Sequence, residues 1–166
     1  MKVLYAIALI VGVINMNTAV HANKLDFSHK NLQAIPAEIY EESTLEELWL
    51  DDNQITQLPE EIQYLSTLKR FSIYKNQLDS LDVLCQMIQL ERINASVNKL
   101  SSLPEQIGDL KNLQVLDLNF NQLSQLPNSI GNLLDLRFIL LASNRLNFSS
   151  LLLPQLNFTR LFEHLI

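Results

Sequence analysis

Apolar residues recur along most of the chain at a spacing that fits neither an isolated helix nor an isolated strand. The clearest example is 113–133, LQVLDLNFNQLSQLPNSIGNL, with apolar residues at positions 1, 4, 6, 11, 14, 18 and 21, asparagine at position 9 and proline at position 15. This pattern predicts an extended run at 116–118, a bend at Asn121 and a return leg that ends helically near Ile130. Such a coil has one apolar edge that it cannot bury alone, so it needs similar coils beside it.

The rest of the chain supplies those coils. Units of 22–23 residues begin at 22, 45, 68, 90, 113 and 136. The first unit has Lys30 at position 9, the third is one residue short with Asp82 in place of proline, and the sixth loses the pattern at Ser149. Position 9 in the other five is asparagine, at steps of 23, 22, 23 and 23, in Asn53, Asn76, Asn98, Asn121 and Asn144.

The recurring asparagines have a physical explanation. Each stands where the chain turns out of its extended run and leaves backbone donors and acceptors inside. An amide side chain both donates and accepts, so a stacked column of amides can satisfy these groups between successive coils. The prolines at position 15 suit a return leg that needs no ladder hydrogen bond, because proline has a fixed φ and no N–H.

This combination identifies leucine-rich repeats. We therefore predict an α/β leucine-rich repeat solenoid over 23–148, with about six repeats of 22–23 residues. Short parallel strands would line its concave face, and the convex side would be irregular or helical.

The two ends of the chain differ from the repeats. Residues 3–14 are continuously apolar and are followed by polar residues and Val20-His21-Ala22, which is typical of a secretory signal over 1–22. This predicts a secreted or extracellular protein; the alternative is an uncleaved, buried N-terminal element. The tail, 149–166, is apolar but out of register, so it either caps the open end of the solenoid or follows a truncated array.

Two segments carry a more specific resemblance: 25–62, LDFSHKNLQAIPAEIYEESTLEELWLDDNQITQLPEEI, and 90–110, LERINASVNKLSSLPEQIGDL. They resemble the N-terminal repeats of the Scribble/Erbin-type family, whose members carry leucine-rich repeats and PDZ domains, and the Ras-group-related leucine-rich repeat proteins. The resemblance implies a scaffold in cell polarity or Ras-type signalling that binds partners on its concave face. It also implies a cytoplasmic, membrane-associated location, opposite to the N-terminal segment, and this chain contains no PDZ domain.

The composition and charge of the chain limit the kinds of partner and of reaction that we expect. A net charge of −6 and a pI near 5 disfavour nucleic acid and anionic lipid as partners. The single Cys85 cannot form an internal disulfide and is expected to be a small core residue. His29 and His164 are far apart, and no phosphate loop or metal-ligand spacing occurs. We therefore expect no enzyme, no cofactor, no metal and no small-molecule substrate.

A protein partner remains, and the residues flanking the strand leucines are the candidates for binding it. The aromatics lie at positions that the fold does not need, and aromatics beside arginines are typical of interaction hot spots. For the charges, simple cross-strand pairs such as Glu47–Arg70 and Asp51–Lys75 are an equal alternative. The candidates are Trp49, Asp51, Arg70, Tyr74, Arg92, Asp117, Asn119 and Phe120.

The predicted function is a protein-interaction module or scaffold. Two alternatives stay open: a regulator that inhibits or activates a GTPase, phosphatase or hydrolase, and a truncated array without independent activity. Three sequons mark possible glycosylation, at Asn94, Asn147 and Asn157.

Overall fold

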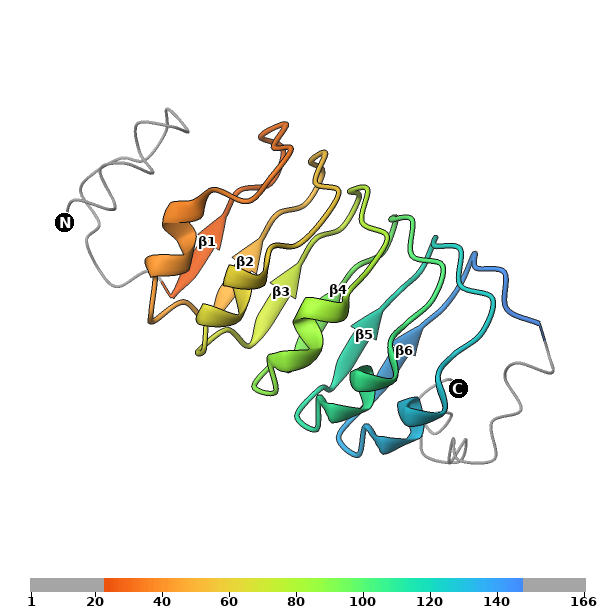
Figure 1. Ribbon diagram of the computed structural model, residues 1–166. Helices are drawn as coiled ribbons and strands as arrows, with labels where there is room; N and C mark the ends of the chain where they lie inside the picture. The colour runs from red at the N-terminus through yellow and green to blue at the C-terminus, as the bar shows by residue number, and fades with distance from the viewer. Residues whose placement is uncertain (1–22, 148–166) are drawn as a thin grey trace.

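The computed structural model describes residues 23–147. The predicted signal, 1–22, and the tail, 149–166, lie outside the described residues. Six short strands form one parallel sheet in sequence order, and the coils that carry them stack into a curved solenoid (Figure 1). The strands are β1 (Lys24–Asp26), β2 (Glu47–Trp49), β3 (Arg70–Ser72), β4 (Arg92–Asn94), β5 (Val115–Asp117) and β6 (Phe138–Leu140).

The sheet register follows the repeat. Each strand pairs with the next at equivalent positions, so that Leu48 lies between Leu25 and Phe71. The predicted strand at 116–118 was wrong by one residue, since β5 begins at Val115. The Val115 N–H already donates to the Glu91 carbonyl of the preceding coil, at 3.2 Å.

The return legs are 3-10 helices on the convex side, which confirms the expected helical turn near Ile130. Four of the five follow a proline whose extended backbone directs the chain back, with φ of −59° to −76° and ψ of 131° to 156°. The helices are η1 (Ala37–Glu41), η2 (Glu60–Tyr64), η3 (Asp82–Gln86), η4 (Glu105–Asp109) and η5 (Asn128–Asn132).

The third repeat absorbs its missing residue on the convex side. The residue before η3 is Leu81, with φ −118° and ψ 13°, instead of an extended proline. The helix therefore begins at repeat position 15, where the other return legs begin theirs at position 16. The Asp82 N–H donates to Ser80 Oγ at 3.0 Å. Strands β3 and β4 keep the common register in spite of the deletion.

One continuous apolar core runs between the sheet and the return legs. Most of the repeat leucines and isoleucines are fully buried; Leu48, Ile62 and Leu116 are examples. Burial of each such side chain contributes roughly 1.5–3 kcal/mol, so packing dominates the stability of the stack. In the last described repeat, Ile139 and Leu141 are only partly buried.

The asparagine column is confirmed. Asn76 is typical: its Nδ2 donates to the Leu50 carbonyl of the preceding coil at 2.9 Å and to the Ile73 carbonyl of its own coil at 3.2 Å. Its Oδ1 accepts from the Ile55 N–H at 3.0 Å. Lys30 at the first corner makes no such contacts, but its N–H donates to Asn53 Oδ1 at 3.0 Å.

An unpredicted backbone feature precedes each corner. The residue at position 8 has a left-handed conformation in every repeat, with φ between 52° and 59°. Glycine and asparagine tolerate this region well, and β-branched residues tolerate it poorly. None of the six is glycine or asparagine; they are His29, Asp52, Lys75, Val97, Phe120 and Ser143.

Candidate functional site

The concave face presents three rows of side chains, at repeat positions 3, 5 and 7. Positions 3 and 5 are the first and last residues of each strand, and position 7 follows two residues later, so all three point to the same side. The edge row, at position 3, is Lys24, Glu47, Arg70, Arg92, Val115 and Phe138. The middle row, at position 5, is Asp26, Trp49, Ser72, Asn94, Asp117 and Leu140. The far row, at position 7, is Ser28, Asp51, Tyr74, Ser96, Asn119 and Ala142.

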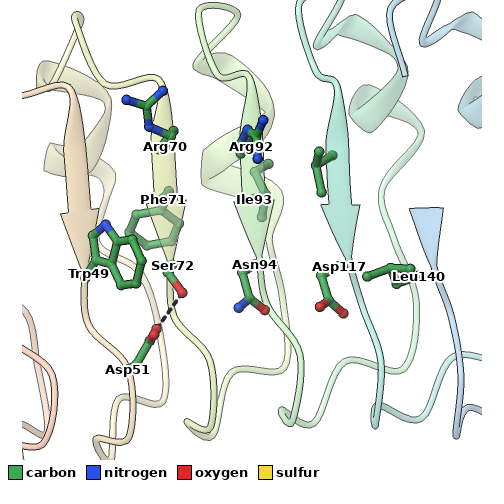
Figure 2. A pocket seen from close by; sticks show the side chains of 11 residues that line it. Trp49, Asp51, Arg70, Phe71, Ser72, Arg92, Ile93, Asn94, Asp117 and Leu140 are labelled. Carbon is green, nitrogen blue, oxygen red and sulfur yellow. Dashed lines mark hydrogen bonds between the residues drawn. The ribbon is translucent and has the colours of Figure 1, made fainter. Parts of the chain in front are cut away.

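A groove of about 300 Å³ crosses these rows from β2 to β6. Figure 2 shows the two arginines at the start of their strands, Trp49 at one end, Leu140 at the other and Asp51 beyond the strand ends. The mixture of apolar and charged groups is typical of a recognition site. Its lining is Trp49, Asp51, Arg70, Phe71, Ser72, Arg92, Ile93, Asn94, Val115, Asp117 and Leu140.

Of the two arginines in the groove, Arg70 has an acidic partner and Arg92 has none among residues 23–147. The Arg70 guanidinium forms an ion pair with Glu47, as predicted, and its Nε donates to Glu47 Oε1 at 2.9 Å. This hydrogen bond lowers the pKa of the Glu47 carboxyl. Arg92 is the register partner of Arg70 on the adjacent strand, and it makes no ion pair with any residue of 23–147. Like charges directly opposite are unfavourable, so this arrangement offers a site for an anionic group.

Asp51 is the half-buried acid of the groove. Its Oδ1 accepts from the Ser72 hydroxyl at 2.6 Å and from the Tyr74 N–H at 3.0 Å. Desolvation by burial raises the pKa of the Asp51 carboxyl, in spite of these hydrogen bonds.

The predicted Asp51–Lys75 pair was wrong. Lys75 Nζ lies 2.8 Å from Asp52 Oδ1, and His29 Nδ1 lies 2.9 Å from Asp52 Oδ2. His29, Asp52 and Lys75 all stand at position 8, directly before the corner, where the left-handed backbone aligns them in adjacent coils. The Lys75 hydrogen bond lowers the pKa of Asp52. Asp51 is thereby left without a lysine partner among the residues that the structure describes.

Trp49 stays accessible at the end of the groove. Its side chain is neither exposed nor buried, and the Lys24 Nζ lies 4.2 Å from the ring centroid. An ammonium at this distance interacts favourably with the indole face. The Lys24 ammonium therefore covers one face of the Trp49 ring.

Five of the eight predicted binding residues line the groove, namely Trp49, Asp51, Arg70, Arg92 and Asp117. The other three do not: Tyr74 and Phe120 are exposed outside it, and Asn119 Oδ1 accepts from the Ala142 N–H at 2.7 Å. The candidates omitted Ser72, Asn94 and Val115, which share repeat positions with chosen residues, and Leu140, which position 5 of the sixth unit would have indicated. Phe71 and Ile93 gave no sequence signal, because their positions belong to the core.

The sequons have different surroundings. Asn94 lines the groove, and its Oδ1 accepts from the Ser96 hydroxyl at 2.6 Å and from the Ser96 N–H at 3.1 Å. Asn147 is exposed, and Asn157 lies outside the described residues. A glycan on Asn94 would occupy the groove, so modification there and occupation by a partner exclude each other.

Other chemistry is sparse in the part of the chain that the structure describes. Cys85 is buried, and burial raises the pKa of its thiol to about 12, which agrees with a core role. Among residues 23–147, no three His, Cys, Asp or Glu side chains gather in a way that could hold a metal ion. No described helix is both long enough and apolar enough to cross a bilayer.

Comparison with known proteins agrees with this geometry. A family model of leucine-rich repeats in two copies matches residues 88–133, and a single leucine-rich repeat model matches 44–65. The chain is a leucine-rich repeat protein. Repeat domains of this type are usually non-catalytic, and no enzyme family was found.

The curated relatives of this leucine-rich repeat protein agree with its resemblance to repeat-and-PDZ proteins. It is 37% identical over 91 residues, 54% of its length, to leucine-rich repeat-containing protein 7 of Rattus norvegicus and of Mus musculus. That protein is densin, a member of the same repeat-and-PDZ family. The match is distant, and the chain spans 5% of the length of these relatives.

Solved structures confirm the fold. A leucine-rich repeat protein of Leptospira interrogans superimposes with a TM-score of 0.60 at 33% identity, over 76% of this chain and 38% of the other. The plant peptide hormone receptor RGFR1, in complex with RGF2, superimposes with a TM-score of 0.65 at 33% identity, over 74% of this chain and 21% of the receptor.

Proposed function

We propose that this leucine-rich repeat protein is a binding module that holds a protein partner in its concave groove. The observation that carries the proposal is the groove itself. It joins a partly exposed Trp49, an Arg92 that makes no ion pair with any residue of 23–147 and an exposed Leu140 in one continuous surface. Aromatic and arginine side chains are the usual anchors of protein interfaces.

The comparisons support the same reading. A similar repeat array, that of the plant receptor, was solved in complex with RGF2. The resemblance to the repeat-and-PDZ family, which implies a scaffold in cell polarity or Ras-type signalling, supports a role in protein binding. Parallel strands of this kind place side chains in fixed rows, so specificity comes from the side chains and the backbone serves as a rigid support.

Partner capture with groove variants tests the proposal. We expect Trp49→Ala to reduce the captured partner by roughly tenfold or more, since an aromatic hot-spot residue contributes about 2 kcal/mol. Tyr64→Ala is the matched control, because Tyr64 is 65% exposed on the convex helix η2. Equal capture by wild type and Trp49→Ala, with unchanged circular dichroism, would reject the concave groove as the binding surface.

A further inference from the structure

The groove separates charge across its width. Positions 2 and 3 of the six repeats, along the starts of the strands, carry five basic and three acidic side chains. Positions 5, 7 and 8, along the ends of the strands, carry four acidic side chains and one lysine. The chain as a whole has a net charge of −6, so the basic edge is a local departure from the overall composition.

Arg92 is the exposed donor of the basic edge. Among the described residues its guanidinium has no carboxylate partner, whereas Glu47 holds Arg70, and Glu46 and Glu91 lie near Arg70 as well. Asn94 stands two residues further along the same strand, on the same face (Figure 2). Its oxygen is engaged by Ser96, while its Nδ2 makes no hydrogen bond within 23–147. Arg92 therefore presents an unpaired donor that suits a carboxylate, whereas Asn94 lies in the middle row beside its register partner Asp117.

Asp51 and Asp117 are the acceptors of the opposite edge. The Asp117 carboxylate accepts from the Asn119 N–H at 3.0 Å and forms no ion pair with the rest of the described chain. Within residues 23–147, Asp51 receives hydrogen bonds from two neutral donors, Ser72 and Tyr74. Both acids line the groove, and each has accepting capacity left for an ammonium or guanidinium group.

The size of the groove favours an extended occupant. Adjacent strands lie about 4.8 Å apart, so the distance from β2 to β6 is roughly 19 Å, which about six residues of extended chain would span. A volume of about 300 Å³ is at the low end for binding pockets. This is enough for the side chains of a few residues of such a chain.

An extended chain that crosses the strands would present its successive side chains alternately to the two edges of the groove. We propose that the groove takes an extended segment of a partner in which acidic and basic side chains alternate. The acidic ones face Arg92, at the starts of the strands, and the basic ones face Asp51 and Asp117, at their ends. Apolar side chains at the ends of the segment pack on Trp49 and Leu140. This inference rests on the proposed protein-binding function and specifies the chemistry of its partner.

An array of seven-residue peptides built from Glu, Lys, Leu, Ser and Tyr tests this pattern on the whole protein. We expect bound sequences to place Glu and Lys an odd number of residues apart and like charges an even number apart. Peptides of the same composition with like charges adjacent should bind about tenfold more weakly, because they lose charge-assisted hydrogen bonds at one edge of the groove.

Two variants test the basic edge and the acidic edge of the groove separately. Arg92→Gln should remove the preference for Glu and leave that for Lys, and Asp117→Asn should do the reverse. Lys99→Gln is the control, since Lys99 is exposed outside the groove and donates to Gln77. Thermal unfolding of each variant checks that the fold is retained.

The possible outcomes separate the two proposals. Binding of peptides that depends on Trp49 but ignores charge order would overturn the alternating pattern and leave the binding function standing. A preference for Glu that survives Arg92→Gln would likewise overturn it. Absence of any peptide bound above the Trp49→Ala background would also overturn it, while the capture of a folded partner independently decides the proposed function.

Discussion

Asn76 Oδ1 accepts a hydrogen bond from the N–H of Ile55, 21 residues earlier, at 3.0 Å. The corner of one coil is thus completed by a side chain of the next. The same bond joins Asn98 to Leu78, Asn121 to Leu100 and Asn144 to Leu123. Neighbouring repeats therefore depend on each other for buried polar groups as well as for apolar burial.

Removal of one amide from the column should destabilise the whole stack. We expect Asn76→Ala to lower the free energy of unfolding by about 1–3 kcal/mol, because buried backbone groups of two coils lose their partners. Chemical denaturation followed by circular dichroism measures the change. Asn144→Ala should cost less, since Asn144 is only partly buried in the last described repeat. An equal or larger loss at Asn144 would contradict this account of the column.

Val97 offers a stabilising substitution. It is a β-branched residue with φ 55°, a conformation that asparagine adopts at much lower cost. Its N–H donates to the Asn119 carbonyl at 2.9 Å, and any replacement except proline keeps this bond. We expect Val97→Asn to raise the free energy of unfolding by about 1 kcal/mol. Val115→Asn, in an ordinary strand, is the control and should give no gain.

Gly108 marks the closest approach of two return legs. A Cβ at this position would lie 2.5 Å from the Ser129 carbonyl oxygen and 2.7 Å from the Ser129 Cβ. The backbone of η5 would have to shift, so Gly108→Ala should cost about 1–3 kcal/mol. Gln106→Ala, at an exposed position of the same helix, should leave the melting temperature nearly unchanged. A stable Gly108→Ala variant would show that η4 and η5 can separate without loss.

Asp51 should impose a pH dependence opposite to that of a salt-bridged acid. Burial raises its pKa in the folded state above that in the unfolded state, so its ionisation opposes folding. The penalty is present above the folded-state pKa and disappears as the pH falls below the unfolded-state pKa. Asp51→Asn keeps an acceptor for Ser72 and Tyr74, and we expect it to raise the melting temperature at pH 7 but not at pH 3. A uniform shift at both pH values would contradict this.

The Cys85 thiol should be inert in the folded protein. It is 4% exposed, and burial raises its pKa to about 12, so little thiolate forms at neutral pH. We expect no reaction with a thiol reagent at pH 7.5 in native buffer and one equivalent in denaturant. Fast labelling of the native protein would indicate that the return leg at η3 opens locally.

The repeat register was predictable because its physical causes are local and periodic. An apolar residue every few positions and an asparagine at each corner admit one stacking arrangement, and the structure has it. The backbone conformation at position 8 was not predictable in the same way, since Val97 and Phe120 are poor choices for a left-handed residue. There the hydrogen bonds of the stack determine the conformation against local preference.

The groove was predicted in part for a related reason. Row membership follows from the register, so Trp49, Arg92 and Asp117 could be placed on the concave face. The same register indicates the partner of Lys75, because Asp52 and Lys75 share position 8 whereas Asp51 stands at position 7, so the expected Asp51–Lys75 pair was offset by one position. The left-handed turn at Asp52 decides which of them meets Lys75.

The third repeat shows where this architecture tolerates a change in length. Its lost residue is taken up at Leu81 and η3, while the pairing of Arg70 with Arg92 continues unbroken on the opposite side. A return leg can thus lose a residue while the spacing of the docking residues stays constant. Redesign of the convex loops, for labels or anchors, is therefore compatible with unaltered recognition on the inner wall.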